Sequence, residues 1–233
     1  MNFLVELLFP RRCPVCDRPV DKMGNYICKK CQEHIRYVQS PFCLKCGKEL
    51  KSSTEEYCED CKNAAHIFDR GRAVYEYESI KEAVYRFKYA GRREFAEFFG
   101  KQTADVLGKE IKGWKPDVIV PVPLHRDREK KRGYNQAALL AKEVSKRLNI
   151  PVNDKIIYRS RATVPQKELN GKERQNNLKN AFKLGQNDVK LKTIIVVDDI
   201  YTTGATMDEM AQCLKSAGAE KIYFVSLAIG RGI

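Results

Sequence analysis

The chain has 233 residues, 43% of them hydrophobic, so it can bury the core of one large domain and carry something smaller beside it. No stretch approaches the roughly 18 consecutive apolar residues of a membrane span. Residues 1–9 are apolar but lack the charged start and small-residue cleavage site of a secretion signal. These features exclude an integral membrane protein and predict a cytoplasmic one.

The net charge of +13 is unevenly spread along the chain. Residues 1–66 hold 11 Lys and Arg against 9 Asp and Glu, which gives +2, and residues 67–233 hold the remaining 32 against 21, which gives +11. A basic field of this size suits polyanionic ligands, either a sugar phosphate or nucleic acid. A polar hinge at residues 62–70 separates two predicted units, residues 1–66 and 67–233. Within the second unit, about 67–115 precedes the sheet core of about 116–233 and is expected to form a hood over it.

Eight of the nine cysteines form four C-x-x-C knuckles, each beginning 15 residues after the last. Such a turn points two sulfurs at one tetrahedral ion, and two knuckles complete a site of four thiolates. Residues 1–66 are therefore predicted to form a double zinc ribbon with two Zn²⁺ ions. Tandem pairing is the simplest arrangement, although spacing alone leaves a cross-braced pairing open. The tandem sets are Cys13, Cys16, Cys28 and Cys31, and then Cys43, Cys46, Cys58 and Cys61.

Because sulfur fills every coordination position, the predicted zinc is structural. His34 and His66 are then not needed as ligands and are expected at the surface. The ribbons can serve as a module that docks on the main domain or on a partner, or they can bind nucleic acid through their arginines and tyrosines. Their nearly balanced charge favours docking.

The predicted hood begins with a strand at 72–77. A capping box formed by Ser79 and Glu82 then opens a helix that reaches about Tyr89 and ends at Gly91, and a second helix covers about 93–109. Lys88 lies in the last turn of the first helix. It is a candidate ligand-binding residue, and the alternative is a solvated helix end.

The predicted core opens with a buried strand at 117–124 that stops at prolines. Five cations follow within residues 125–132, just beyond the strand end, which indicates a second phosphate site with His125 and Arg126 as candidate contacts. A solvated charge run is the alternative. A helix is expected over 135–148 and a short strand at 156–158.

Residues 159–183 hold seven basic residues against two acidic ones. The segment is long enough to order over an anionic ligand as a lid. Alternatively, it is a permanently exposed basic surface for single-stranded nucleic acid, although it contains few aromatic side chains for stacking.

Residues 193–206 organise the rest of the chain. Four β-branched aliphatic residues at 194–197 predict a strand buried on both faces, which ends at Asp198 and Asp199. A turn of small residues leads into a helix from about residue 206, and the last core strand is expected at 221–229. A strand end, a short loop and a helix N-terminus form an anion site. Thr202 and Thr203 supply hydroxyls, Gly204 lets a ligand approach the backbone closely, and the N–H groups of the loop, which continues through Ala205 to Thr206, can surround a phosphate. An ordinary strand-to-helix corner, with the Asp pair as a helix cap, is the alternative.

This segment resembles the phosphoribosyl pyrophosphate (PRPP) motif of type I phosphoribosyltransferases: four hydrophobic residues, two acidic residues and a Thr-Gly-x-Thr loop. Three other landmarks occur in order: the tandem knuckles, Phe-Lys-Tyr-x-Gly at 87–91, and Val-Pro-Val-Pro-Leu-His at 120–125 with Arg-Gly-Tyr-Asn-Gln at 132–136. Together they look like the ComF/ComFC family over essentially the whole chain.

The resemblance implies an α/β fold: a type I phosphoribosyltransferase-like parallel sheet flanked by helices, preceded by the zinc-ribbon domain. It also implies that Asp198 and Asp199 bind the ribose hydroxyls of PRPP, that residues 202–206 bind its 5′-phosphate, and that the loop at His125 and Arg126 receives pyrophosphate with Mg²⁺. Members of the family serve natural competence in the bacterial cytosol. Single-stranded DNA and a ComFA-type helicase are therefore expected partners.

One position departs from the pattern of purine salvage enzymes, which often carry a third acidic residue three positions after the pair. Thr202 stands there and cannot act as a general base at neutral pH. Two hypotheses follow. The first is a competence protein that binds PRPP and DNA and retains transferase activity toward an unknown acceptor. The second is a metabolic phosphoribosyltransferase that acts on a nucleobase or another small acceptor. In either case Asp198 and Asp199 are the candidate catalytic residues.

Overall fold

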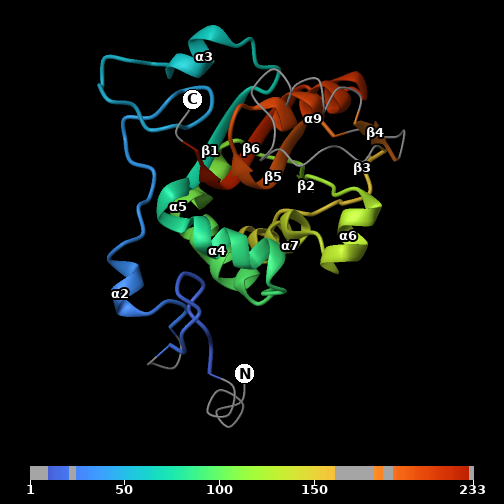
Figure 1. The fold of residues 1–233 in the computed structure, drawn as a ribbon. Helices are drawn as coiled ribbons and strands as arrows, with labels where there is room; N and C mark the ends of the chain where they lie inside the picture. The colour runs from blue at the N-terminus through green and yellow to red at the C-terminus, as the bar shows by residue number, and fades with distance from the viewer. Residues whose placement is uncertain (1–9, 21–24, 161–180, 186–190, 231–233) are drawn as a thin grey trace.

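A four-stranded parallel sheet forms the centre of the protein (Figure 1). The computed structural model describes residues 10–20, 25–160, 181–185 and 191–230. The strands β1 (Arg70–Glu76), β2 (Val118–Pro121), β5 (Thr193–Tyr201) and β6 (Lys221–Ile229) lie in the order β1-β6-β5-β2. The two central strands, β5 and β6, pair in parallel along their whole length.

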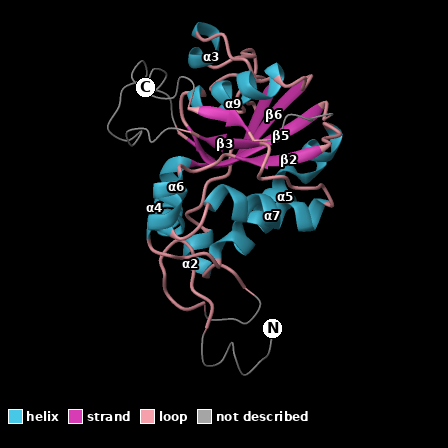
Figure 2. Ribbon diagram, turned by 90° about the vertical axis from the view of Figure 1, so that its right-hand side faces the viewer, coloured by secondary structure: helices cyan, strands magenta, loops and turns pink. Residues whose placement is uncertain are grey.

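Helices cover both faces of the sheet, which is what parallel strands with apolar residues on both sides require. Figure 2 shows α9 (Ala205–Ser216) on one face and α5 (Phe95–Gly113) and α7 (Gln136–Leu148) on the other. Successive residues of β5 alternate between these layers, since Ile194 and Val196 pack with α9, whereas Ile195 and Val197 pack with the helices opposite. The predicted parallel sheet flanked by helices is confirmed.

Shorter elements extend the ends of the sheet. Helix α4 (Tyr77–Tyr89) follows β1 and packs beside α5, and α6 (Arg126–Arg132) follows β2. An antiparallel pair, β3 (Ile157–Arg159) and β4 (Phe182–Leu184), forms a separate two-stranded sheet. Most of the predicted lid, residues 161–180, lies outside the described residues.

Three local predictions are wrong. Strand β5 does not end at the Asp pair but continues through it to Tyr201. The cationic stretch after β2 is not a loop, because α6 occupies it. Helix α4 starts before the predicted capping box, so the Ser79 hydroxyl donates to the carbonyl oxygen of Glu76 (2.9 Å) instead of capping the helix.

The first ribbon contacts the helical layer formed by α4 and α5. The Tyr26 hydroxyl donates to Glu97 (2.7 Å), and Arg92 forms an ion pair with Asp17 (2.7 Å). In Figure 1 its short helix α2 (Lys29–Gln32) lies on the side of the sheet away from α9.

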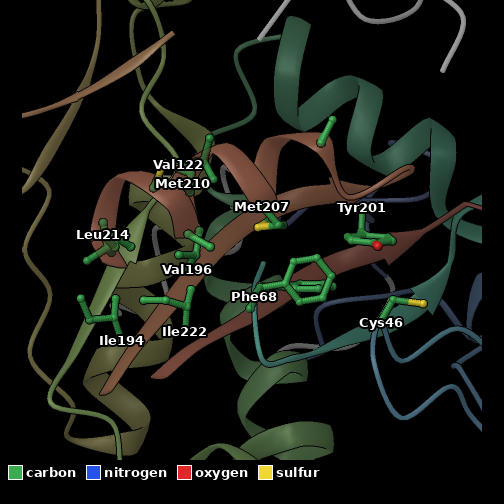
Figure 3. Close-up of a cluster of buried hydrophobic side chains, with 14 of the residues drawn as sticks. Cys46, Phe68, Val122, Ile194, Val196, Tyr201, Met207, Met210, Leu214 and Ile222 are labelled. Atoms are coloured by element: carbon green, nitrogen blue, oxygen red, sulfur yellow. The ribbon is translucent and has the colours of Figure 1, made fainter. Parts of the chain in front are cut away.

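The second ribbon, which carries α3 (Glu59–Asn63), lies on the opposite face and takes part in the main core. Its Cys43, Cys46 and Cys58 belong to the same buried cluster as Phe68 and the inner face of α9 (Figure 3). Gly47 adopts φ +75°, and a Cβ there would come within 2.6 Å of the Gly71 carbonyl oxygen, so no larger residue fits this approach.

Strand β1, at the start of the predicted hood, pairs in parallel with β6 of the predicted core. The division at residue 66 stays a prediction. Each described helix is too short or too polar to cross a lipid bilayer.

The two ribbons should contribute unequally to stability. We predict that Cys46→Ser lowers the free energy of unfolding of the whole chain by about 3 kcal/mol or more, since zinc binding and core burial are both lost. Cys16→Ser, in a ribbon whose described residues contact the helical layer, should release one zinc ion and shift the main transition less. Zinc content and chemical denaturation of both variants test this, and equal shifts would contradict it.

Candidate functional site

The eight knuckle cysteines gather into two groups of four, Cys13/Cys16/Cys28/Cys31 and Cys43/Cys46/Cys58/Cys61. Within each group the sulfur atoms lie within 4.8 Å of one another, as the ligands of one tetrahedral ion do. Two four-thiolate sites fit two structural Zn²⁺ ions. The grouping is tandem and not cross-braced.

The Asp pair lies at the carboxyl end of β5, at the middle of the sheet. Alternation along the strand directs the two side chains to opposite faces. Asp199 is buried, with 3% of its surface exposed, and its carboxylate meets Lys88 from the last turn of α4, with Nζ 2.8 Å from Oδ1. Lys88, which the sequence offered as a candidate ligand-binding residue, therefore contacts the Asp pair.

The electrostatics of the pair are set by burial and by its neighbours. Burial and the repulsion of Asp199 raise the pKa of Asp198 to about 7, although Lys88 and Arg159 attract the charged form. Burial lowers the pKa of Lys88, but the attraction of Asp199 and its hydrogen bond outweigh this, so the pKa is raised. The lysine therefore stays charged and neutralises one carboxylate.

A buried carboxylate oxygen of Asp199 is available to a ligand. Asp199 Oδ2 is buried and has no hydrogen-bond partner among the described residues. A buried carboxylate oxygen of this kind is expected to accept a hydrogen bond or to coordinate a cation. The arrangement fits a hydroxyl donor or a magnesium ion at this position.

The loop that follows the pair shapes a small hollow lined by residues 200–207. Gly204 is the N-cap residue of α9 and has φ +83°. Because glycine has no side chain, it cannot accept a hydrogen bond from the N–H groups in the first turn of the helix. A Cβ at Gly204 would lie 2.6 Å from His66 Cε1 and 2.7 Å from the Tyr201 hydroxyl oxygen. Glycine is therefore required here, and the bare helix N-terminus can receive an anion.

His66 was expected at the surface, and this prediction is wrong. Its side chain is 2% exposed, and its Nδ1 lies 2.8 Å from Asp208 Oδ2 in the first part of α9. The other carboxylate oxygen of Asp208 accepts from the backbone N–H of Ile67 (2.7 Å). The contact joins segments far apart in the chain, so no local pattern could have predicted it.

The predicted pyrophosphate contacts lie near the end of β2, the strand next to β5. His125 caps α6, its Nδ1 accepting from the N–H of Asp127 at 3.4 Å, and Arg126 is exposed. Neither forms a hydrogen bond or an ion pair with the Asp pair within the described residues. Arg159 of β3, which the sequence did not single out, is close enough to Asp198 for the two charges to act on each other's pKa.

Two family models match successive parts of the chain. Residues 4–62 match the double zinc ribbon domain, and residues 100–232 match the phosphoribosyl transferase domain. The fold and site therefore define a phosphoribosyltransferase-type domain preceded by a double zinc ribbon.

Two of the curated relatives are similar over nearly the full length, and a third over about two thirds of it. Competence protein F of Haemophilus influenzae is 33% identical, with 98% of this chain and 99% of the relative covered. DNA utilization protein YhgH of Escherichia coli (strain K12) is 32% identical over 93% and 96%. Competence protein ComFC of Bacillus subtilis (strain 168) is 31% identical over 69% and 67%. The chain belongs to the ComF/ComFC family.

The raised pKa of Asp198 makes stability depend on pH. Between its ordinary value of 3.8 and about 7, the folded protein holds a proton that the unfolded chain has released, so stability from this group falls as pH rises through that window. We predict that Asp198→Asn removes this loss, so that its stability relative to the wild type is greater near pH 8 than near pH 5 by about 1–3 kcal/mol.

Urea unfolding at the two pH values measures the difference. Asp105→Asn, at an aspartate whose side chain is 50% exposed on α5, is the matched control. A stability difference between Asp198→Asn and wild type that does not change with pH would contradict the assignment.

Proposed function

We propose that this protein binds PRPP at the carboxyl end of β5 and handles single-stranded DNA during natural transformation. The observation that carries the PRPP part is the buried Asp199, held by Lys88 on one oxygen and open on the other, directly before a loop that exposes a helix N-terminus. A sugar hydroxyl and a phosphate need these two features side by side.

Each end of the ligand has a proposed partner. The N–H groups and hydroxyls of residues 202–206 bind the 5′-phosphate, since a loop and a helix N-terminus offer several donors at once. Asp198 and Asp199 accept from the ribose hydroxyls. His125 and Arg126, at the end of the neighbouring strand, receive the pyrophosphate, and Mg²⁺ supplies charge neutralisation between pyrophosphate and ribose oxygens when it is bound.

If the protein is an enzyme, the reaction is displacement of pyrophosphate from C1′ of PRPP by a nucleophile. The bond from C1′ to the pyrophosphate oxygen breaks as the bond to the acceptor forms, and the electron pair leaves with pyrophosphate. The residues of this chain would position the ribose and stabilise the leaving group. Thr202 supplies no base for the acceptor. A metabolic transferase remains the alternative, and pyrophosphate release with one nucleobase would favour it.

The proposed DNA partner is supported by charge and by the relatives. Residues 67–233 carry a net charge of +11, which suits a polyanion. The relatives are named for competence and for DNA utilization. A cytoplasmic location and a ComFA-type helicase as partner complete the proposal.

The PRPP assignment predicts that Asp198→Asn with Asp199→Asn weakens Mg²⁺-dependent PRPP binding about hundredfold or more, because the amides keep the shape but neither bind Mg²⁺ well nor accept as strongly. Calorimetry of the zinc-loaded variant measures this, with Asp105→Asn as the control and circular dichroism as the test of folding. Unchanged affinity in a folded double variant would reject the role of the pair.

A further inference from the structure

Two tyrosines stand together on the outer face of α4. Tyr85 and Tyr89 are 51% and 56% exposed, more than any other large hydrophobic side chain in the described part of the chain. They are one helical turn apart, and their ring centroids lie 5.1 Å from each other. Adjacent exposed aromatic rings offer a contiguous apolar surface, which is a feature of interaction sites.

Helix α6 brings positive charge to the same place. The Arg132 guanidinium lies over the Tyr89 ring, 5.0 Å from its centroid, and Figure 2 shows α6 next to α4. Five of the seven residues of α6 are cations against two acids, and Arg126, Lys130 and Lys131 are exposed. No sequence pattern joins these segments, because the tyrosines belong to the predicted hood and the cations to the predicted core.

The surface is held rigidly. The Tyr134 hydroxyl, just after α6, donates to the carbonyl oxygen of Phe87 in α4. Arg93 at the start of the next helical region donates to the carbonyl oxygen of Gly133 (2.6 Å). These bonds fix α6 against α4 before any ligand arrives, which reduces the entropy lost on binding.

The surface also borders the proposed PRPP site. Lys88, the residue before Tyr89, turns the other way and bonds to Asp199 at 2.8 Å. A ligand on the tyrosines would therefore lie at the rim of the Asp pair.

We propose that Tyr85, Tyr89, Arg132 and the exposed Lys130 and Lys131 of α6, together the tyrosine platform, bind single-stranded nucleic acid. Bases stack on the two rings, and the backbone phosphates lie against α6. Duplex bases are already stacked on one another, so the platform favours single strands. The proposal rests on the proposed function, in which DNA is the partner, and adds where the strand binds.

Charge and shape together select this ligand. An acidic protein would engage the cations without needing the rings, and a free nucleotide would use the rings without needing a row of cations. A single strand carries both planar groups and repeated negative charge, so it uses the whole platform.

The test is a fluorescence-anisotropy titration of the full-length, zinc-loaded protein with a labelled, mixed-sequence DNA strand at several salt concentrations. Tyr85→Ala with Tyr89→Ala should weaken binding about tenfold or more and leave the salt dependence unchanged, since stacking involves no counterion release. Tyr85→Phe with Tyr89→Phe should keep the affinity because the rings remain. Tyr57→Ala, at a 41% exposed tyrosine of the second ribbon, is the matched control.

The charge variant is Lys130→Gln with Lys131→Gln, which leaves Arg126 in place for the proposed PRPP site; it should weaken binding and reduce the salt slope by about 0.7 for each phosphate that the variant no longer neutralises. Wild-type affinity in the alanine variant would overturn the platform while leaving DNA binding as proposed. No DNA binding by the wild type would overturn both the DNA partner and the platform. Equal affinity for duplex and single strands would also overturn the platform, and a parallel PRPP titration of the alanine variant shows whether the neighbouring site is intact.

Discussion

The ion pair between Lys88 and Asp199 is the interaction on which the site depends. Two adjacent carboxylates at the end of a buried strand repel each other and lose hydration, so they would destabilise the sheet without a counter-charge. Lys88 provides it from the helical layer, on one oxygen only. As a result β5 can extend through the pair to Tyr201, the other oxygen stays open to a ligand, and Asp198 is poised to titrate near neutral pH.

The second ribbon is an integral part of the core and not an attached module. Its cysteines share that core with Tyr201 and the inner face of α9 (Figure 3). Tyr201 and His66 in turn lie so close to Gly204 that no side chain fits there. The conformation of the loop at residues 202–206 is thus supported by a ribbon whose four thiolates fit a structural zinc ion. The first ribbon instead stabilises the outer helices that carry Lys88 and the two exposed tyrosines.

The sequence was most informative where spacing or an unbroken apolar run determines structure locally. The knuckle interval predicted both thiolate groups, and residues 194–197 predicted the central buried strand. It was wrong where distant residues decide. The end of β5 was misplaced because the neutralising lysine lies on another element, and His66 was misplaced because its partner Asp208 is remote. Helix α6 was not predicted because its run of cations suggested a phosphate-binding loop or a solvated segment. The helix ends at Gly133, which adopts the left-handed conformation.

A single PRPP site formed by the Asp pair and the loop after it is tested most directly by calorimetry. The zinc-loaded wild-type protein would be titrated with PRPP, with and without Mg²⁺. We predict saturable binding of one PRPP per chain that is markedly tighter with Mg²⁺. Absence of binding at millimolar PRPP in the presence of Mg²⁺ would contradict this assignment.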